Sequence, residues 1–194
     1  MNIWKTLFYS AAVYGIFELI SSKMKSDRLK DMENELANAE VKAFLMVIRY
    51  AEGTDRPEDY RTMFGGTYAN PRRFEAPPWN HPDIANTAGV YTSTAAGAYQ
   101  FLHSTWELVQ RDLDLPDFSP HSQDVAAVYR LHQRKVLDHV KAGNFTRAIY
   151  GDPDVSGTGA NKEWASLPGS PYGQPTKSFA ELEAVFEQNG GILA

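Results

Sequence analysis

The sequence predicts a mainly α (α+β) domain with a small irregular or β lobe, preceded by an N-terminal helical tether. Three observations predict this. Apolar residues recur at helical spacing through residues 41–52. Helical periodicity disappears between residues 56 and 94, where Gly and Pro interrupt the chain. An apolar run at residues 3–20 is followed by alternating charges at residues 23–40.

These segments predict three parts: a hydrophobic membrane anchor or signal-anchor at residues 1–22, a charged helical linker at 23–40 and a globular domain at 41–194. A helix over residues 3–20 spans roughly 27 Å, slightly less than the hydrocarbon core of a bilayer. Four interpretations of this segment stay open: a membrane anchor, an uncleaved export signal, a cleaved signal peptide, or a helix that docks on another protein. The cleaved signal is disfavoured because residues 21–25 form a poor cleavage region.

Composition narrows the possible partners and ligands. The formal net charge of −5 argues against nucleic acid, because phosphate binding needs a basic surface. The chain has no cysteine, which excludes disulfides and thiolate metal sites, and its histidines form no zinc-type pair. We therefore predict no nucleic-acid partner, no metal and no cofactor.

The first helix of the globular part, over residues 41–52, carries the first candidate for chemistry. Ala43, Phe44, Val47 and Ile48 fall on one face, and Gly53 is a typical helix stop. Glu52 ends this apolar helix, where desolvation would raise the pKa of its carboxyl toward that of a general acid. The alternative is an ordinary exposed glutamate at a helix end.

The remaining elements follow from local signals. Residues 56–94 predict a long irregular lobe with a short hairpin. Helices are expected from Thr94 to about residue 113, over residues 120–142 after Ser119, over 144–150, and over 178–188.

Three segments combine residue types that suit a sugar-binding cleft: A-E-G-T-D (51–55), S-T-A-A-G-A-Y-Q-F (93–101) and W-A-S-L-P-G-S-P-Y-G-Q (164–174). They offer a carboxyl, hydroxyls, amides and aromatic faces, and pyranose rings have one apolar face and a polar rim. In order and spacing, together with D-F-S-P-H-S-Q-D (117–124), they resemble the lambda-type phage endolysins. These are lysozyme-fold lytic transglycosylases, and the likeness covers about residues 41–191.

The resemblance implies a two-lobed lysozyme-like fold, with bacterial peptidoglycan bound in a cleft between the lobes. Glu52 matches the family's single acid–base glutamate. The positions that match the substrate-binding motifs are Ser93, Thr94, Tyr99, Gln100, Trp164, Tyr172 and Gln174. Two departures matter: Ala98 stands where the family has Arg, and the segment before residue 41 has no counterpart in the soluble enzymes of this type.

The residues also bear on the reaction type. Most glycosidases use two carboxylates, and a neighbouring family of phage lysozymes has an Asp where this chain has Arg61. Asp55, Glu58 and Asp59 are the nearby alternatives. Intramolecular attack by the substrate's own hydroxyl needs no second carboxylate, so a transglycosylase is favoured over a muramidase.

Two roles for such an enzyme stay open. It could lyse the host from the periplasm, tethered to the membrane through residues 3–20, or act at entry, attached to a virion through the same segment. A non-catalytic wall-binding virion protein is the alternative from another functional class, and a small anchored scaffold unrelated to sugars is a third.

Overall fold

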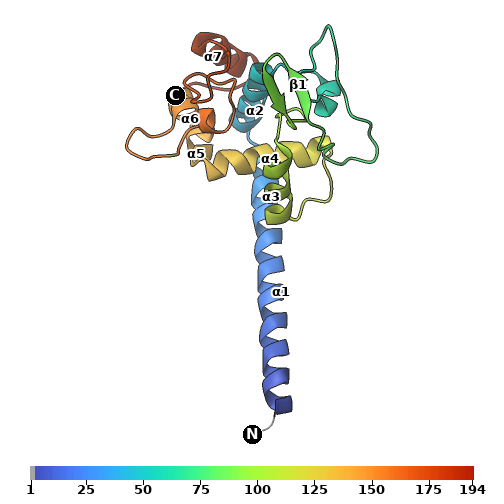
Figure 1. Ribbon diagram of the computed structural model, residues 1–194. Helices are drawn as coiled ribbons and strands as arrows, with labels where there is room; N and C mark the ends of the chain where they lie inside the picture. Colours follow the sequence, from blue (N-terminus) through green and yellow to red (C-terminus); the bar gives the residue numbers. More distant parts are fainter. Residues whose placement is uncertain (1–2) are drawn as a thin grey trace.

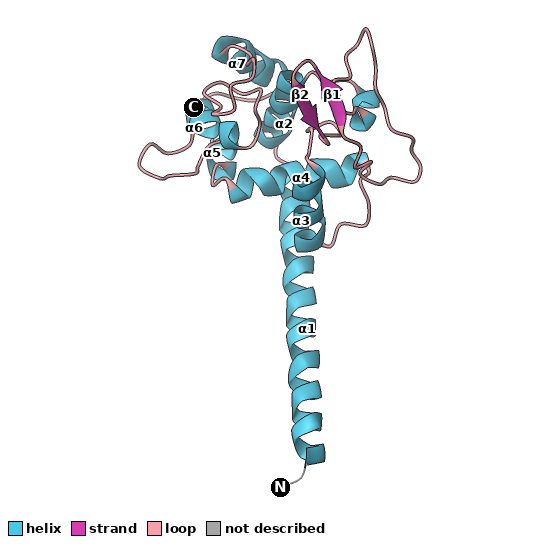
Figure 2. Cartoon of the chain, in the orientation of Figure 1, coloured by secondary structure: helices cyan, strands magenta, loops and turns pink. Residues whose placement is uncertain are grey.

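The computed structural model describes residues 3–194, and the side chains from residue 16 onward. Helix α1 (Ile3–Glu35) projects as a rod from a body formed by all the other elements (Figure 1). The body is mainly helical with one two-stranded sheet (Figure 2), so the predicted fold class is confirmed. The side chains of residues 3–15, which make up most of the predicted anchor, lie outside the described residues.

Helix α1 runs without interruption through the predicted anchor and linker. Its last turns belong to the body: Met32 is buried, Arg28 donates a hydrogen bond to the Asp112 carbonyl over 3.3 Å, and Glu35 pairs with Lys141 at 2.7 Å. The C-terminal part of the predicted linker is therefore packed against the body. In the part of the chain that the structure describes, no helix is long and apolar enough to cross a membrane.

Helix α2 (Ala39–Glu52) confirms the predicted core helix. Asn38 caps it by accepting a hydrogen bond from the Val41 N–H at 2.9 Å. The predicted apolar face is buried, and Gly53 ends the helix in the left-handed conformation, with φ of 71°. Glu52 is thus held at the point where a buried helix reaches the surface of the lobe.

One lobe is built around α2. Helices α5 (Leu137–Lys141), α6 (Phe145–Tyr150) and α7 (Phe179–Gln188) pack against it or against one another. In its core, Phe44 meets Phe145 and Phe186 edge to face, and the rings of Phe145 and Phe186 are tilted against each other. The capping box of Ser178 and Glu181 starts α7, which confirms the predicted final helix.

The other lobe confirms the predicted irregular segment with a short hairpin. It contains the 3-10 helix η1 (Pro57–Arg61) and strands β1 (Asn86–Ala88) and β2 (Tyr91–Ser93), which pair antiparallel. Helix α3 (His103–Leu113) closes it. Phe74, Trp106 and Phe118 form its aromatic core, which packs the long loop despite its lack of regular structure.

Two predicted helix boundaries were wrong. The helix expected from Thr94 begins at His103, because Gly97 and Gln100 have φ of 81° and 48° and the chain folds back so that Ala96 pairs with Phe101.

The helix expected over residues 120–142 is also divided. It forms α4 (Pro120–Gln133) and α5, because Lys135 adopts a φ of 58° between them. A second 3-10 helix, η2 (Ala160–Lys162), precedes the last loop.

Candidate active site

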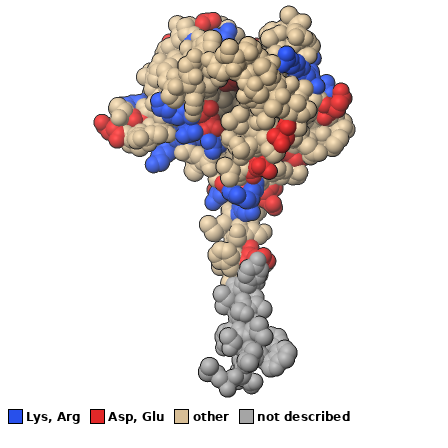
Figure 3. Space-filling model, viewed as in Figure 1, with Lys and Arg blue, Asp and Glu red and all other residues tan. Residues whose placement is uncertain are grey.

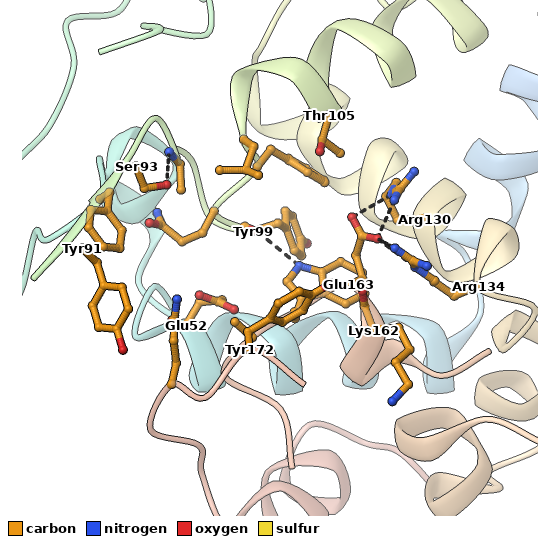
Figure 4. Close-up of a pocket in the computed structure, with 18 of the residues that line it drawn as sticks. Glu52, Tyr91, Ser93, Tyr99, Thr105, Arg130, Arg134, Lys162, Glu163 and Tyr172 are labelled. Carbon is orange, nitrogen blue, oxygen red and sulfur yellow. Dashed lines mark hydrogen bonds and ion pairs between the residues drawn. The ribbon is translucent and has the colours of Figure 1, made fainter. Parts of the chain in front are cut away.

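A cavity of about 380 Å³ lies between the lobes. Its walls are the C-terminal end of α2, strand β2 with the following turn, and the segment from residue 162 to 174 (Figure 4). These are the three segments that the sequence marked as chemically suited to a sugar cleft. They come from distant parts of the chain and are joined by hydrogen bonds from Thr54 to Ala98 and from Trp164 to Tyr99.

Glu52 is half-buried in this pocket and has one polar side-chain partner. The Ser166 hydroxyl donates a hydrogen bond of 2.6 Å to Glu52 Oε1. Burial raises the pKa of Glu52 from its ordinary value of 4.5 to about 7, and the hydrogen bonds from Ser166 oppose part of that increase. A carboxyl with this pKa can both donate and accept a proton near neutral pH.

The turn over residues 94–101 is held from behind by two neighbouring elements. The side-chain oxygen of Gln123, Oε1, accepts a hydrogen bond from the Ala98 N–H at 2.8 Å, and the Thr54 hydroxyl donates one to the Ala98 backbone carbonyl at 2.6 Å. A Cβ at Gly97 would lie 2.2 Å from Gln123 Oε1, so only glycine fits. These contacts present Gln100 and the edge of Tyr99 to the pocket.

The loop that contains Trp164 and Tyr172 lies across the pocket from this turn and is attached to it. Trp164 Nε1 donates to the Tyr99 carbonyl at 3.2 Å, and Trp164 itself is buried. Tyr172 is exposed, and its hydroxyl donates to the Lys162 carbonyl at 2.8 Å. The pocket therefore has one rigid aromatic side, at Trp164 and Tyr99, and one open aromatic, Tyr172.

Of the predicted site residues, Thr94 alone is absent from the lining. Its hydroxyl accepts from the His103 N–H at 3.3 Å and supports the start of α3. The structure brings the rest together around one cavity: Glu52, Ser93, Tyr99, Gln100, Trp164, Tyr172 and Gln174. That any of them contacts substrate stays a prediction.

The nearby carboxylates lie elsewhere. Asp55 accepts a hydrogen bond from Tyr68, and the Arg56 guanidinium lies 3.6 Å from the centre of the same tyrosine ring. Asp59 is buried and bonds Thr62 and Arg73. Neither these two nor Glu58 lines the pocket, so each has a structural task away from Glu52.

Ala98 is also away from the cavity. Its side chain is fully buried behind the turn, and its two backbone groups are bonded to Gln123 and Thr54. The alanine at this position therefore contributes to the packing behind the site and does not line the pocket.

Several residues at the site were missed by sequence reasoning. Ser166, which bonds Glu52 without lining the pocket, lies inside the quoted motif, so its hydroxyl was available as a signal. Four lining residues have no local signal, because they reach the pocket from α4, from η2 or from the residue directly after each: Arg130, Arg134, Lys162 and Glu163.

A two-lobed helical fold with a buried acid in an inter-lobe cleft defines a lysozyme-like, glycan-cleaving enzyme. The comparisons agree. The endolysin family model matches residues 42–193, and the chain belongs to this family of phage enzymes that degrade bacterial peptidoglycan.

Two relatives are similar over most of their length. The endolysin of Escherichia phage P2 is 34% identical over 165 residues, covering 79% of this chain and 94% of that protein. The endolysin of Escherichia phage lambda is 32% identical over 163 residues, covering 80% and 94%. A solved structure of bacteriophage lambda lysozyme complexed with a chitohexasaccharide superposes with a TM-score of 0.69 at 32% identity, covering 81% of this chain and 97% of that one.

Proposed function

We propose that this endolysin is a lytic transglycosylase in which Glu52 is the only acid–base group. Protonated Glu52 donates its proton to the glycosidic oxygen between N-acetylmuramic acid and N-acetylglucosamine, and the bond to C1 breaks. The resulting carboxylate takes the proton from the muramic acid 6-hydroxyl as that oxygen bonds to C1. The products are a 1,6-anhydro end and a free 4-hydroxyl, and Glu52 is protonated again.

The observation that carries the proposal is the set of carboxylates around the pocket. Among its lining residues, all of them in the described part of the chain, the carboxylates are Glu52 and Glu163. Glu163 is held by the guanidinium groups of Arg130 and Arg134, so Glu52 has no carboxylate partner free to act as nucleophile or base. Attack by the substrate's own hydroxyl needs none.

The substrate-binding part of the proposal rests on the lining. Ser93, Gln100 and Gln174 supply polar groups, and the exposed Tyr172 supplies ring surface. Tyr99 and Trp164 are nearly buried and form part of the wall of the same cavity. The similarity to a lambda lysozyme solved with a chitohexasaccharide supports an oligosaccharide along this cleft. Thr94 would contribute only through the turn that it supports.

The test is the mass of the products. Purified peptidoglycan is digested with the full chain, and the muropeptides are weighed without borohydride reduction. We expect products one water lighter than the hydrolysis products and unreactive toward reducing-end reagents. Free reducing ends would instead identify a muramidase. The absence of any product would favour a non-catalytic wall-binding protein.

We further propose that residues 3–20 tether the enzyme to a membrane, so that it acts from the host periplasm. Apolar side chains near the end of this segment, Phe17, Leu19 and Ile20, are exposed, and α1 projects away from the body (Figure 1). Fractionation of producing cells tests this. The full chain should sediment with membranes, and a chain that begins at Lys23, which keeps the packed Met32, should not. If the full chain and the shortened chain divide equally between the membrane and soluble fractions, the result would instead favour attachment to a virion or to another protein.

A further inference from the structure

One end of the pocket is basic. Arg130 and Arg134 reach it from α4 and the residue after that helix, and Lys162 reaches it from η2. Figure 4 shows them on the side of the cavity opposite Tyr91 and Ser93, with Glu52 between the two sides. The proposed bond cleavage does not use these three cations.

Glu163 holds the two arginines in place. It is nearly buried, with 9% of its side chain exposed, and its Oε2 accepts from Arg130 Nη2 at 2.5 Å and from Arg134 Nη2 at 2.8 Å. Two further bonds come from the Nε atoms, at 2.8 Å from Arg130 and 2.9 Å from Arg134. Four hydrogen bonds to one carboxylate fix both guanidinium planes, which lowers the entropy cost of binding another anion.

Charge remains after this pairing. Three cations and one carboxylate leave two positive charges at this end of the pocket. In the described part of the chain, no ion pair involves Lys162 and no hydrogen bond uses Arg134 Nη1. The formal net charge of the whole chain is −5, so the charge at this end of the pocket is opposite in sign to the overall charge. Figure 3 shows basic side chains grouped over the part of the body where α4 and α5 meet.

The chemistry of the polymer indicates what would bind there. The sugar rings of peptidoglycan carry hydroxyl and acetamido groups, which are neutral. The carboxylates belong to the peptide stem, which is attached through a lactyl ether to the muramic acid. A guanidinium and an ammonium beside a sugar cleft are suited to a stem carboxylate and have no comparable partner on the glycan.

We propose that Arg134, held in place by Glu163, and Lys162 bind a carboxylate of the peptide stem. The pocket would thereby distinguish strands with charged stems from strands whose stems are neutral. This inference rests on the proposed function, since it needs a strand in the cleft.

The experiment compares two substrates: intact peptidoglycan strands, and the same strands after carbodiimide coupling with excess ammonia has converted the stem carboxylates into neutral amides. The quantity measured is the ratio of kcat/KM on strands with free stem carboxylates to kcat/KM on the amidated strands. We expect Lys162→Gln and Arg134→Gln each to lower this ratio by about tenfold, the effect of one charge-assisted contact. Added salt should lower the wild-type ratio as well.

Lys42→Gln is the matched control. Lys42 is exposed on α2 and does not line the pocket, so its removal makes the same charge change at another place. Its ratio should equal that of the wild type.

A ratio unchanged in Lys162→Gln and Arg134→Gln would overturn the inference, because the cluster would then be only a structural ion-pair group. Thermal unfolding checks that the variants fold. Lys162→Gln breaks no ion pair in the described part of the chain and keeps the test decisive if Arg134→Gln unfolds. A wild type inactive on both substrates would instead refute the proposed function.

Discussion

The middle of the pocket and its basic end each contain a partly buried glutamate, and the two glutamates have opposite surroundings. Glu52 accepts one hydrogen bond from a side chain, the neutral hydroxyl of Ser166. Glu163 accepts four from two guanidinium groups. Burial penalises a charged carboxylate in both places, but only at Glu163 do neighbouring cations compensate that penalty.

One cavity can thereby keep proton transfer and the positioning of charged side chains at separate glutamates. A carboxyl without a cationic partner keeps a pKa near 7 and can exchange its proton during a reaction. A carboxylate between two arginines is suited to hold those arginines in a fixed geometry. The same residue type thus has two functions, which are set by the elements packed against it.

Removal of the Glu52 carboxyl should have the largest effect. Glu52→Gln keeps the size of the side chain and cannot supply a proton, so we expect activity on peptidoglycan to fall at least about a thousandfold, within the range for lost general acid catalysis. The measurement is turbidity loss of outer-membrane-permeabilised cells, with circular dichroism to confirm the fold. Wild-type turnover by this variant would mean that another group supplies the proton.

The sequence predicted the Glu52 side of this comparison and missed the other side. Helix α2, its buried face and its stop at Gly53 are encoded within one continuous stretch, residues 39–53, so periodicity and a glycine were enough to find them. The motif segments also indicated most of the lining. In contrast, the partners of Glu163 are Arg130 on α4 and Arg134 directly after it, about thirty residues earlier in the chain. The local sequence around Glu163 does not indicate that these arginines lie beside it.

The wrong helix start has the same physical origin. Residues 94–101 have good local helix formers, but the buried Gln123 side chain bonds the Ala98 N–H and fills the space beside Gly97. A contact between residues 25 positions apart thereby overrides local propensity.

The pH dependence of stability should separate the two glutamates. The folded state holds the Glu52 proton up to about pH 7, whereas the unfolded chain releases it near 4.5. The stabilisation from this proton is therefore fully present below pH 4.5 and is lost as the pH rises to about 7. The loss corresponds to about 3 kcal/mol of unfolding free energy.

Urea titrations at several pH values measure this loss as the difference between wild type and Glu52→Gln, because Gln has no proton to lose. The difference should favour the variant increasingly from pH 4.5 to pH 8. Parallel stability curves would show that burial does not hold the proton on Glu52.

Truncation at the basic end should reduce stability. Glu163→Ala leaves Arg130 and Arg134 facing each other without their shared carboxylate, with side chains 17% and 28% exposed. We expect a loss of about 2 kcal/mol, less than for a fully buried pair because water reaches both arginines. Chemical denaturation measures it, with Glu33→Ala, which removes the exposed partner of His121, as the control. A loss no larger than that of the control would show that the arginines need no anchor.

The smallest effect should come from the hydroxyl that links Glu52 to the facing loop. Ser166 lowers the pKa of Glu52, so Ser166→Ala should raise it further and move the alkaline limb of the kcat/KM profile to higher pH. At the optimum, the lost positioning bond should lower the rate by about threefold to tenfold. Ser170→Ala, which removes a hydroxyl from the same loop outside the pocket lining, should leave the limb in place. A change in rate with an unmoved limb would mean that Ser166 orients the loop without acting on the proton, and the contrast with Glu163 would then rest on burial alone.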